Sequence, residues 1–118
     1  METDNMESQL RLNEERIRLR EKLKQVLPDL MNAESALLDI AYRDGILSSK
    51  FKRLVAMAIA VRAECTNCIL AQTKYALEAG ATKEEILEVL AVAVAMSGTT
   101  GIAESLRVVK LLEELGHL

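Results

Sequence analysis

Apolar residues recur every three or four positions through most of this chain, and short polar stretches interrupt them. This spacing is typical of amphipathic helices, in which about 3.6 residues complete one turn. The pattern predicts six helices, over about residues 8–26, 30–43, 49–61, 66–79, 82–97 and 99–115. Residues 1–7 are polar and are expected to form a frayed start.

Residues with special backbone or capping roles mark the boundaries between these helices. Pro28 ends the first helix and suits the first turn of the second. Gly80 is placed to stop the fourth helix, and Thr82 with Glu85 forms a capping box that opens the fifth. Thr99 or Thr100 is expected to cap the sixth helix. The chain is therefore predicted to be helical throughout.

A chain of 118 residues is long enough for one hydrophobic core, although an oligomer interface helps at this size. The only alternating segment, residues 91–94, consists of Ala and Val within a capped helix and does not favour a strand. We expect an all-α, single-domain bundle of about six helices. Residues 1–25 should form an amphipathic helix at an oligomer interface, and residues 26–118 the main domain.

Charge and composition exclude several classes of function. The formal net charge is −3, and the basic residues between positions 11 and 24 alternate with Glu and lack aromatic neighbours, so a nucleic-acid surface is not favoured. No segment approaches the ~18 apolar residues of a membrane span, and the N-terminus lacks the apolar centre of a signal peptide. We therefore expect a cytoplasmic protein without a membrane or nucleic-acid partner.

The residues best suited to a chemical role are the two cysteines of Cys65-Thr66-Asn67-Cys68. Residues three apart share one face of a helix, so the two sulfurs can meet, and a helix N-terminus stabilises a thiolate there. Two other interpretations stay open. Zinc needs about four ligands, and the chain offers only this pair and His117 at its end, unless two chains pool their cysteines. The pair can also be two small buried side chains without chemistry.

Several segments together resemble the carboxymuconolactone decarboxylase family, in its alkylhydroperoxidase D-like branch. The matching segments are Tyr42-Arg43-Asp44-Gly45-Ile46-Leu47, Lys52 to Ala58, Glu64-Cys65-Thr66-Asn67-Cys68-Ile69, Ala76 to Ile86 and Met96-Ser97-Gly98. The combination of the Cys pair with Glu78-Ala79-Gly80-Ala81-Thr82 is more specific than either part alone. The resemblance covers about residues 28–115 and leaves the first helix outside.

The resemblance implies a helical fold that assembles into trimers or hexamers. It implies that Cys68 is the attacking thiol and Cys65 the resolving thiol of a cycle between dithiol and disulfide. The substrate would be a small peroxide or disulfide, and a dithiol donor would return the electrons. Neither flavin nor haem nor a metal is implied. The first helix has no counterpart in the resemblance and is expected to cover a neighbouring subunit rather than its own chain.

The chain departs from the proton relay of the family it resembles. Gln72 and Asn67 stand where the family has His residues, and Arg53 stands where it has Glu. Amides do not titrate and Arg is always protonated, so none of the three can act as a general base near pH 7. Glu64 is the one acid next to the pair, and an exposed charge before a helix is its ordinary interpretation. Arg53 can either favour the thiolate of the pair or form a surface ion pair.

These observations favour a thiol–disulfide oxidoreductase of the alkylhydroperoxidase-like, peroxiredoxin type that is only weakly active as a peroxidase. The alternatives are a decarboxylase-type lyase, whose members use a pocket His and generally lack the pair, and a non-catalytic oligomeric scaffold. Tyr75 lies two turns after Cys68 and either lines the pocket or packs in the core. Met57 and Met96 lie in apolar runs and are expected in the core.

Overall fold

The computed structural model describes residues 6–118, and all regular structure in that range is helical. Residues 1–5 of the start predicted to be frayed lie outside the described residues. The six helices are α1 (Gln9–Val26), α2 (Pro28–Tyr42), α3 (Ser49–Ala63), α4 (Thr66–Glu78), α5 (Lys83–Ser97) and α6 (Thr99–Glu114). The predicted all-α, six-helix, single-domain fold is confirmed.

Most helix boundaries follow the capping residues expected from the sequence. Pro28 is the first residue of α2, and Gly80 has a φ of 99° just beyond the end of α4. The Thr82 hydroxyl accepts from the Glu85 N–H at 3.1 Å, and the Glu85 carboxylate accepts from the Thr82 N–H at 2.9 Å. Both bonds of the predicted capping box are thus present.

The predicted cap of the last helix is wrong. Gly98, with a φ of 63°, precedes α6, and no side chain caps that end. Thr99 is already the first residue of the helix, so neither it nor Thr100 stands in the capping position. The physical reason is the short connection: a single glycine with a positive φ, a conformation that other residues rarely adopt, joins α5 to α6 without a loop in which a threonine could cap.

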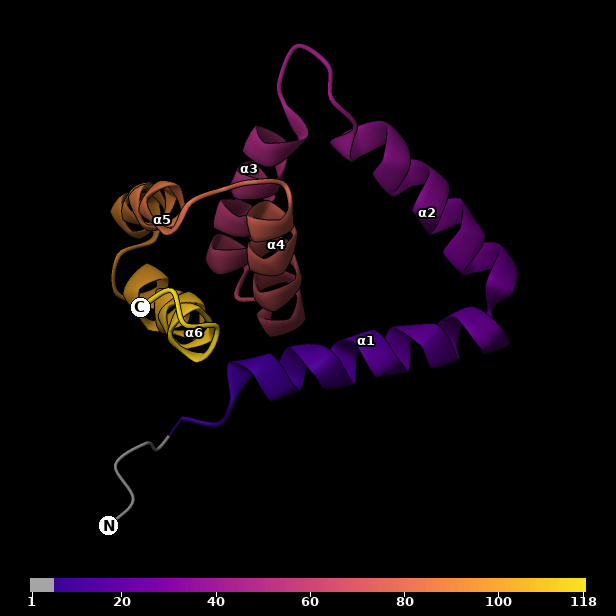
Figure 1. Cartoon of the computed structure of the whole chain (residues 1–118), viewed down its shortest axis with the longest axis horizontal. Coiled ribbons are helices and arrows are strands. Elements are labelled where there is room, and N and C mark those ends of the chain that lie inside the picture. Colours follow the sequence, from indigo (N-terminus) through magenta and orange to yellow (C-terminus); the bar gives the residue numbers. More distant parts are fainter. Residues whose placement is uncertain (1–5) are drawn as a thin grey trace.

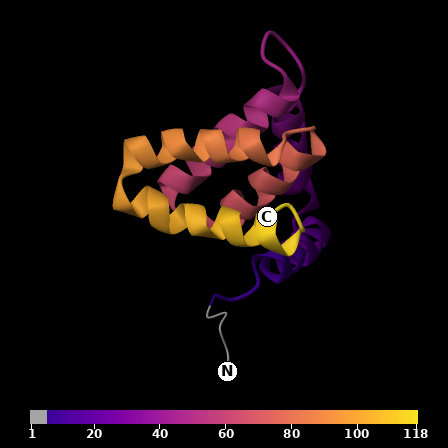
Figure 2. The ribbon, with the colours of Figure 1, turned by 60° about the vertical axis from the view of Figure 1, so that its left-hand side comes forward.

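Helices α3, α4, α5 and α6 pack together and enclose the hydrophobic core. Figure 2 shows α5 and α6 lying side by side across this group. The fully buried side chains come from all four helices and include Met57, Val61, Ile69, Ile86, Val108 and Leu112. The end of α3 and the start of α4 meet beside this core, and the two cysteines lie at that junction.

Helices α1 and α2 extend outside this four-helix core. In Figure 1 they form two sides of a triangle whose third side is α3 with α4. α1 packs against α4 and α6 of its own chain, so the expectation that it has no partner within the chain is wrong. The missed contact is polar: Gln9 and Asn13 are buried, whereas Ile17, Leu19 and other apolar side chains of α1 stay exposed.

Glu114 of α6 fastens the N-terminus of α1. Its carboxylate accepts hydrogen bonds from the backbone N–H groups of Gln9 at 2.8 Å and Leu10 at 3.2 Å, and from the Ser8 hydroxyl. Burial of this carboxyl raises its pKa, but the Ser8 bond and the backbone bonds outweigh burial and hold the pKa below its usual range. A carboxylate also complements the positive end of the helix dipole.

The two methionines expected in the core have different environments. Met57 is fully buried, whereas Met96 is 77% exposed, so the expectation for Met96 is wrong. On α5 the buried positions are Ile86, Leu90 and Ala93, which share one face at helical spacing. Met96 lies instead on the same face as the exposed Val92. Because the residues around Met96 are apolar on both faces of the helix, the sequence does not show which face is buried. Within residues 6–118, no helix is long and apolar enough to cross a membrane.

Candidate active site

Cys65 and Cys68 are joined by a disulfide at the N-terminus of α4. Cys65 is the N-cap residue, and its sulfur accepts a hydrogen bond from the Cys68 N–H at 3.3 Å. Cys68 is the third residue of the helix, and the two Cα atoms are 5.2 Å apart. Both sulfurs therefore lie among the unpaired N–H groups of the first turn, where a negative sulfur is stabilised.

The turn between α3 and α4 places the pair there. Glu64 ends α3 in the left-handed conformation, with a φ of 58°, and the Cys65 N–H donates to the Ala60 carbonyl at 3.1 Å. This turn reverses the chain, so that Cys65 can begin α4 immediately. Glu64 itself is exposed, as its ordinary interpretation predicts, and its side chain is not among those that line the cavity next to the pair.

A cavity of about 280 Å³ opens beside Cys68. Cys68 is exposed and lines this cavity, whereas Cys65 is half-buried behind it. The walls come from four helices: Arg16 and Arg20 from α1, Glu34 and Leu38 from α2, Arg53 from α3, and Asn67, Ala71, Gln72 and Tyr75 from α4. An incoming molecule thus meets the second cysteine of the pair first.

Arg53 is held in this cavity wall by neutral groups. Its Nη1 donates to the Gln72 side-chain oxygen at 3.1 Å. Its guanidinium carbon lies 3.5 Å from the centre of the Tyr42 ring and 4.4 Å from that of Tyr75, so the cation is stacked between two aromatic rings. Among residues 6–118 Arg53 forms no ion pair, and the expectation of a surface pair with an acid is not met.

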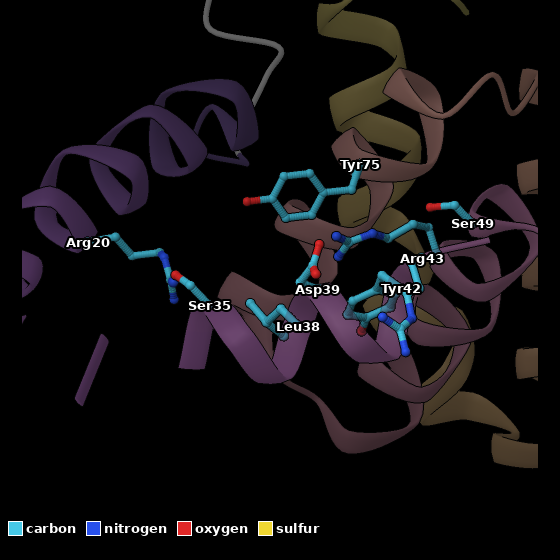
Figure 3. A pocket seen from close by; sticks show the side chains of 9 residues that line it. Arg20, Ser35, Leu38, Asp39, Tyr42, Arg43, Ser49 and Tyr75 are labelled. Atoms are coloured by element: carbon cyan, nitrogen blue, oxygen red, sulfur yellow. The ribbon is translucent and has the colours of Figure 1, made fainter. Parts of the chain in front are cut away.

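A second cavity, of about 450 Å³, adjoins the first and shares Arg20, Leu38, Arg53 and Tyr75 with it. Figure 3 shows Tyr75 from α4 facing Asp39 and Tyr42 of α2 across this space, with Arg20 of α1 at its far side. Arg43 and the two serines at positions 35 and 49 complete the lining. The two cavities follow the inner side of the triangle that α1 and α2 form with the core.

Among residues 6–118, Glu34 is the one carboxylate that lines the cavity next to Cys68, and it is paired with Arg20 through its two oxygens. The hydrogen bond from Arg20 lowers the pKa of Glu34, with a smaller opposing effect of burial and a further lowering by the charge of Arg20. An ionised, paired carboxylate is a weak proton acceptor near neutral pH. The cavity therefore offers hydrogen-bond donors and positive charge rather than a general base.

The family assignment rests on the same helices. The model of the carboxymuconolactone decarboxylase family matches residues 28–111, from the start of α2 almost to the end of α6. The chain belongs to the carboxymuconolactone decarboxylase family. Both cysteines and the auxiliary positions predicted from the sequence lie within the matched segment.

Two curated relatives of this family member are proteins without an assigned activity. An uncharacterised protein of Cupriavidus necator is 39% identical over 79 residues, which cover 67% of this chain and 70% of the relative. An uncharacterised protein of the cox locus of Paracoccus denitrificans is 34% identical over 80 residues, which cover 68% of this chain and 72% of the relative.

Solved structures of family proteins share the fold of this chain. A carboxymuconolactone decarboxylase family protein of Legionella pneumophila, in its apo form, is 31% identical with a TM-score of 0.85, over 92% of this chain and 97% of that chain. A Thermotoga maritima protein is 32% identical with a TM-score of 0.72, over 87% and 90% of the two chains. A further structure from Thermotoga maritima, with a TM-score of 0.64, 32% identity and coverage of 75% and 88%, is described with a suggested role in the antioxidative response.

Four of the six positions selected from the sequence come together in this family member. Cys68, Arg53, Asn67 and Gln72 line one cavity, and Cys65 lies directly behind them in the disulfide. Glu64 is the exposed C-cap of α3 and is not among the residues that line this cavity. His117 is exposed near the C-terminus, and residues 6–118 contain no group of three or more His, Cys, Asp or Glu side chains arranged to hold a metal ion.

Sequence reasoning missed the contributions of α1 and α2 to the cavity. Arg16 and Arg20 are four residues apart and so share one face of α1, a spacing that signals a common target. Because acidic and basic residues alternate in this segment, its pattern favours interpreting the two arginines as part of a solvated helix face. Glu34 belongs to no motif, and Tyr42 begins a family-like segment that gives it no role, so the contribution of both residues is found only from the packing of α2. Tyr75 lines both cavities, which favours the pocket interpretation over a core position.

Proposed function

We propose that this protein is a thiol–disulfide oxidoreductase in which Cys68 attacks and Cys65 resolves. The observation that supports the proposal most is the disulfide at the start of α4, with Cys68 open to a cavity and Cys65 half-buried behind it. An attacking thiol must meet its substrate, whereas a resolving thiol needs only to reach its partner. The exposure of the two residues agrees with these roles.

In the proposed reaction, the Cys68 thiolate attacks one sulfur of a substrate disulfide and displaces a thiolate. Cys65 then attacks the Cys68 sulfur and displaces the second substrate thiolate, which closes the Cys65–Cys68 bond. Two electrons pass from the protein dithiol to the substrate, and the two protons lost by the cysteines end on the two released thiols. A dithiol donor, here any small dithiol, reduces the pair by the reverse exchange.

The surroundings of the pair favour disulfides over peroxides as substrates. A thiol has a pKa of about 8.5, so its thiolate leaves without help from an acid, whereas the oxygen leaving group of a peroxide needs a proton. Arg53, Gln72 and Asn67 supply hydrogen bonds and charge but no transferable proton near pH 7. We therefore propose that peroxide reduction is a slow side activity of this alkylhydroperoxidase-like site.

We further propose that the working form is a homo-oligomer, a trimer or a hexamer, in the cytoplasm. Support for assembly comes from apolar side chains that the single chain leaves exposed. Several of them lie on α2 and the loop after it, with Leu30, Leu37 and Ile40 near 60% exposed and Ile46 fully exposed. Patches of this kind mark interaction surfaces. A reducing compartment supplies the dithiol that the cycle requires.

Steady-state turnover with dithiothreitol as the donor tests the function. Wild type should reduce hydroxyethyl disulfide faster than cumene hydroperoxide, each measured above the reaction of dithiothreitol alone. Cys68→Ser should abolish both activities, whereas Thr66→Ser, which changes a residue between the cysteines, should retain them. Turnover that persists in Cys68→Ser, or wild-type turnover no faster than free dithiothreitol, would refute the proposal; the second result leaves a non-catalytic scaffold.

A further inference from the structure

The two adjoining cavities beside Cys68 are positively charged in a protein whose formal net charge is −3. Four arginines line them, at positions 16, 20, 43 and 53, against two carboxylates, Glu34 and Asp39. Four positive and two negative charges leave an excess of two. The rest of the chain is correspondingly more acidic, so the positive charge is concentrated where Cys68 is reached.

Three of these arginines, at positions 16, 43 and 53, form no ion pair with a carboxylate among the described residues, and two of the three, Arg16 and Arg53, line the cavity next to Cys68. Arg16 donates through Nε to the Asn13 side-chain oxygen at 2.9 Å, and Asn13 is itself buried. Arg53 is fixed by the amide of Gln72 and by its two stacked tyrosines. In both cases a neutral group sets the position of the cation and leaves its charge uncompensated. Arg20, in contrast, is neutralised by Glu34.

Leu38, Ala71 and the ring of Tyr75 supply apolar surface to the same cavity. The cavity volume of about 280 Å³ suits a small organic molecule rather than a bare ion. We infer that the oxidised substrate of this site is a small organic disulfide that carries a carboxylate, with Arg53 and Arg16 binding the carboxylate while Cys68 attacks the disulfide. This inference rests on the function proposed above and adds the class of substrate.

Guanidinium groups suit this task because they present paired N–H donors in the geometry of a carboxylate. The same charges have a second effect on the reaction. A thiolate in solution repels an anionic disulfide and reacts faster with a cationic one, simply from the sign of its charge. A site that carries two uncompensated arginines should reverse that order, and the reversal distinguishes specific binding from ordinary thiol chemistry.

The test uses three disulfides that differ in charge: dithiodipropionate, which is anionic, hydroxyethyl disulfide, which is neutral, and cystamine, which is cationic. Pre-reduced full-length protein is mixed with each, and closure of the Cys65–Cys68 bond is followed without any donor. The same rates are measured for dithiothreitol as the reference thiol. Relative to that reference, wild type should prefer dithiodipropionate over cystamine, and the preference should weaken as salt concentration rises.

Removing the two arginines should remove the preference. Arg53→Gln and Arg16→Gln should each raise the concentration of dithiodipropionate needed for half-maximal rate by roughly tenfold relative to that for hydroxyethyl disulfide. The neutral disulfide serves as the reference because a change in thiol pKa affects its rate and that of dithiodipropionate alike. Matched controls remove one charge from the same helices outside the cavities: Arg62→Gln on α3, and Arg18→Gln on α1, where Arg18 is exposed and paired with Glu15. Both controls should retain the wild-type order.

The outcomes separate this inference from the proposed function. If wild type follows the order of dithiothreitol, or if the Arg16→Gln/Arg53→Gln double variant keeps the anionic preference, the substrate class is wrong while the oxidoreductase stands. If none of the three disulfides closes the Cys65–Cys68 bond, the proposed function fails first and the substrate class fails with it. Loss of the preference in the double variant, with hydroxyethyl disulfide still reacting, supports both.

Discussion

Arg53 donates a hydrogen bond of 3.1 Å to the side-chain oxygen of Gln72, and both residues line the cavity that exposes Cys68. The family resemblance implies a proton relay at these two positions, with Glu in place of Arg53 and His in place of Gln72. Here a permanent cation and an uncharged amide occupy them, bound to each other. We propose that this pair of residues provides electrostatic stabilisation and positioning and leaves the movement of protons to solvent or to the substrate.

The charge of Arg53 should lower the pKa of the attacking thiol. A nearby cation favours the thiolate and adds to the effect of the helix N-terminus, so the thiol pKa should rise in the order wild type, Arg53→Gln, Arg53→Glu. The rate of alkylation of the reduced protein against pH measures this pKa. Arg62→Gln, which removes a charge from the same helix, should match wild type. Superimposable titrations of wild type and both Arg53 variants would contradict the prediction.

The two cysteines should differ in what they trap. In Cys65→Ser, the resolving step is lost, and a mixed disulfide or sulfenic acid should accumulate on Cys68. In Cys68→Ser, the remaining Cys65 is half-buried and should accumulate little. Mass spectrometry after brief exposure to hydroxyethyl disulfide or peroxide measures both. Trapping on Cys65 alone would show that the roles are inverted.

Glu114 should stabilise the docking of α1 in a pH-dependent way. Its pKa is lowered in the folded protein, so its contribution is fully present above the unfolded value of about 4.3 and is lost as pH falls through the folded value. Glu114→Gln should cost about 1 kcal/mol at pH 7, the usual value of an N-terminal capping interaction. Urea denaturation at pH 7 and at pH 3 measures the difference.

Glu113→Gln is the control for that experiment, because Glu113 is adjacent, exposed and paired only with Lys110 at the surface. It should change the free energy of unfolding little at either pH. A Glu114→Gln protein with wild-type stability at pH 7, or with an undiminished deficit at low pH, would mean that the carboxylate does not fasten α1.

Assembly should depend on the exposed apolar face of α2. Burying a large aliphatic side chain contributes about 1.5–3 kcal/mol, so Leu37→Glu should lower the assembly state of a protein that otherwise contains at least three chains. Asn32→Glu, on the opposite face of α2, should leave it unchanged. Light scattering at micromolar concentration decides; a monomeric wild type would exclude the proposed oligomer. Deleting residues 1–24 should also lower the number of chains in the assembly, because it removes the exposed apolar side chains of Ile17 and Leu19.

The helices and the position of the cysteine pair were predictable because each depends on a few neighbouring residues. Thr82 with Glu85, Pro28 and Gly80 act within one turn, and Cys65 caps a helix that begins directly after it. The side of α5 to which Met96 belongs depends on where α6 packs, so the sequence did not reveal it. Likewise, Arg16 lines the cavity next to Cys68 and Tyr42 lines the adjoining one only because α1 and α2 fold back along the core.

The reversibility of the Cys65–Cys68 disulfide tests the central proposal most directly. The chain contains two cysteines, so every thiol measured in the unmodified protein belongs to this pair. The protein is equilibrated in buffers with increasing ratios of reduced to oxidised dithiothreitol, alkylated and weighed by mass spectrometry. We expect one two-electron transition in which both cysteines become alkylated together, identical when approached from the oxidised and the reduced side. A pair that stays oxidised, or stays reduced, across the whole series would contradict it.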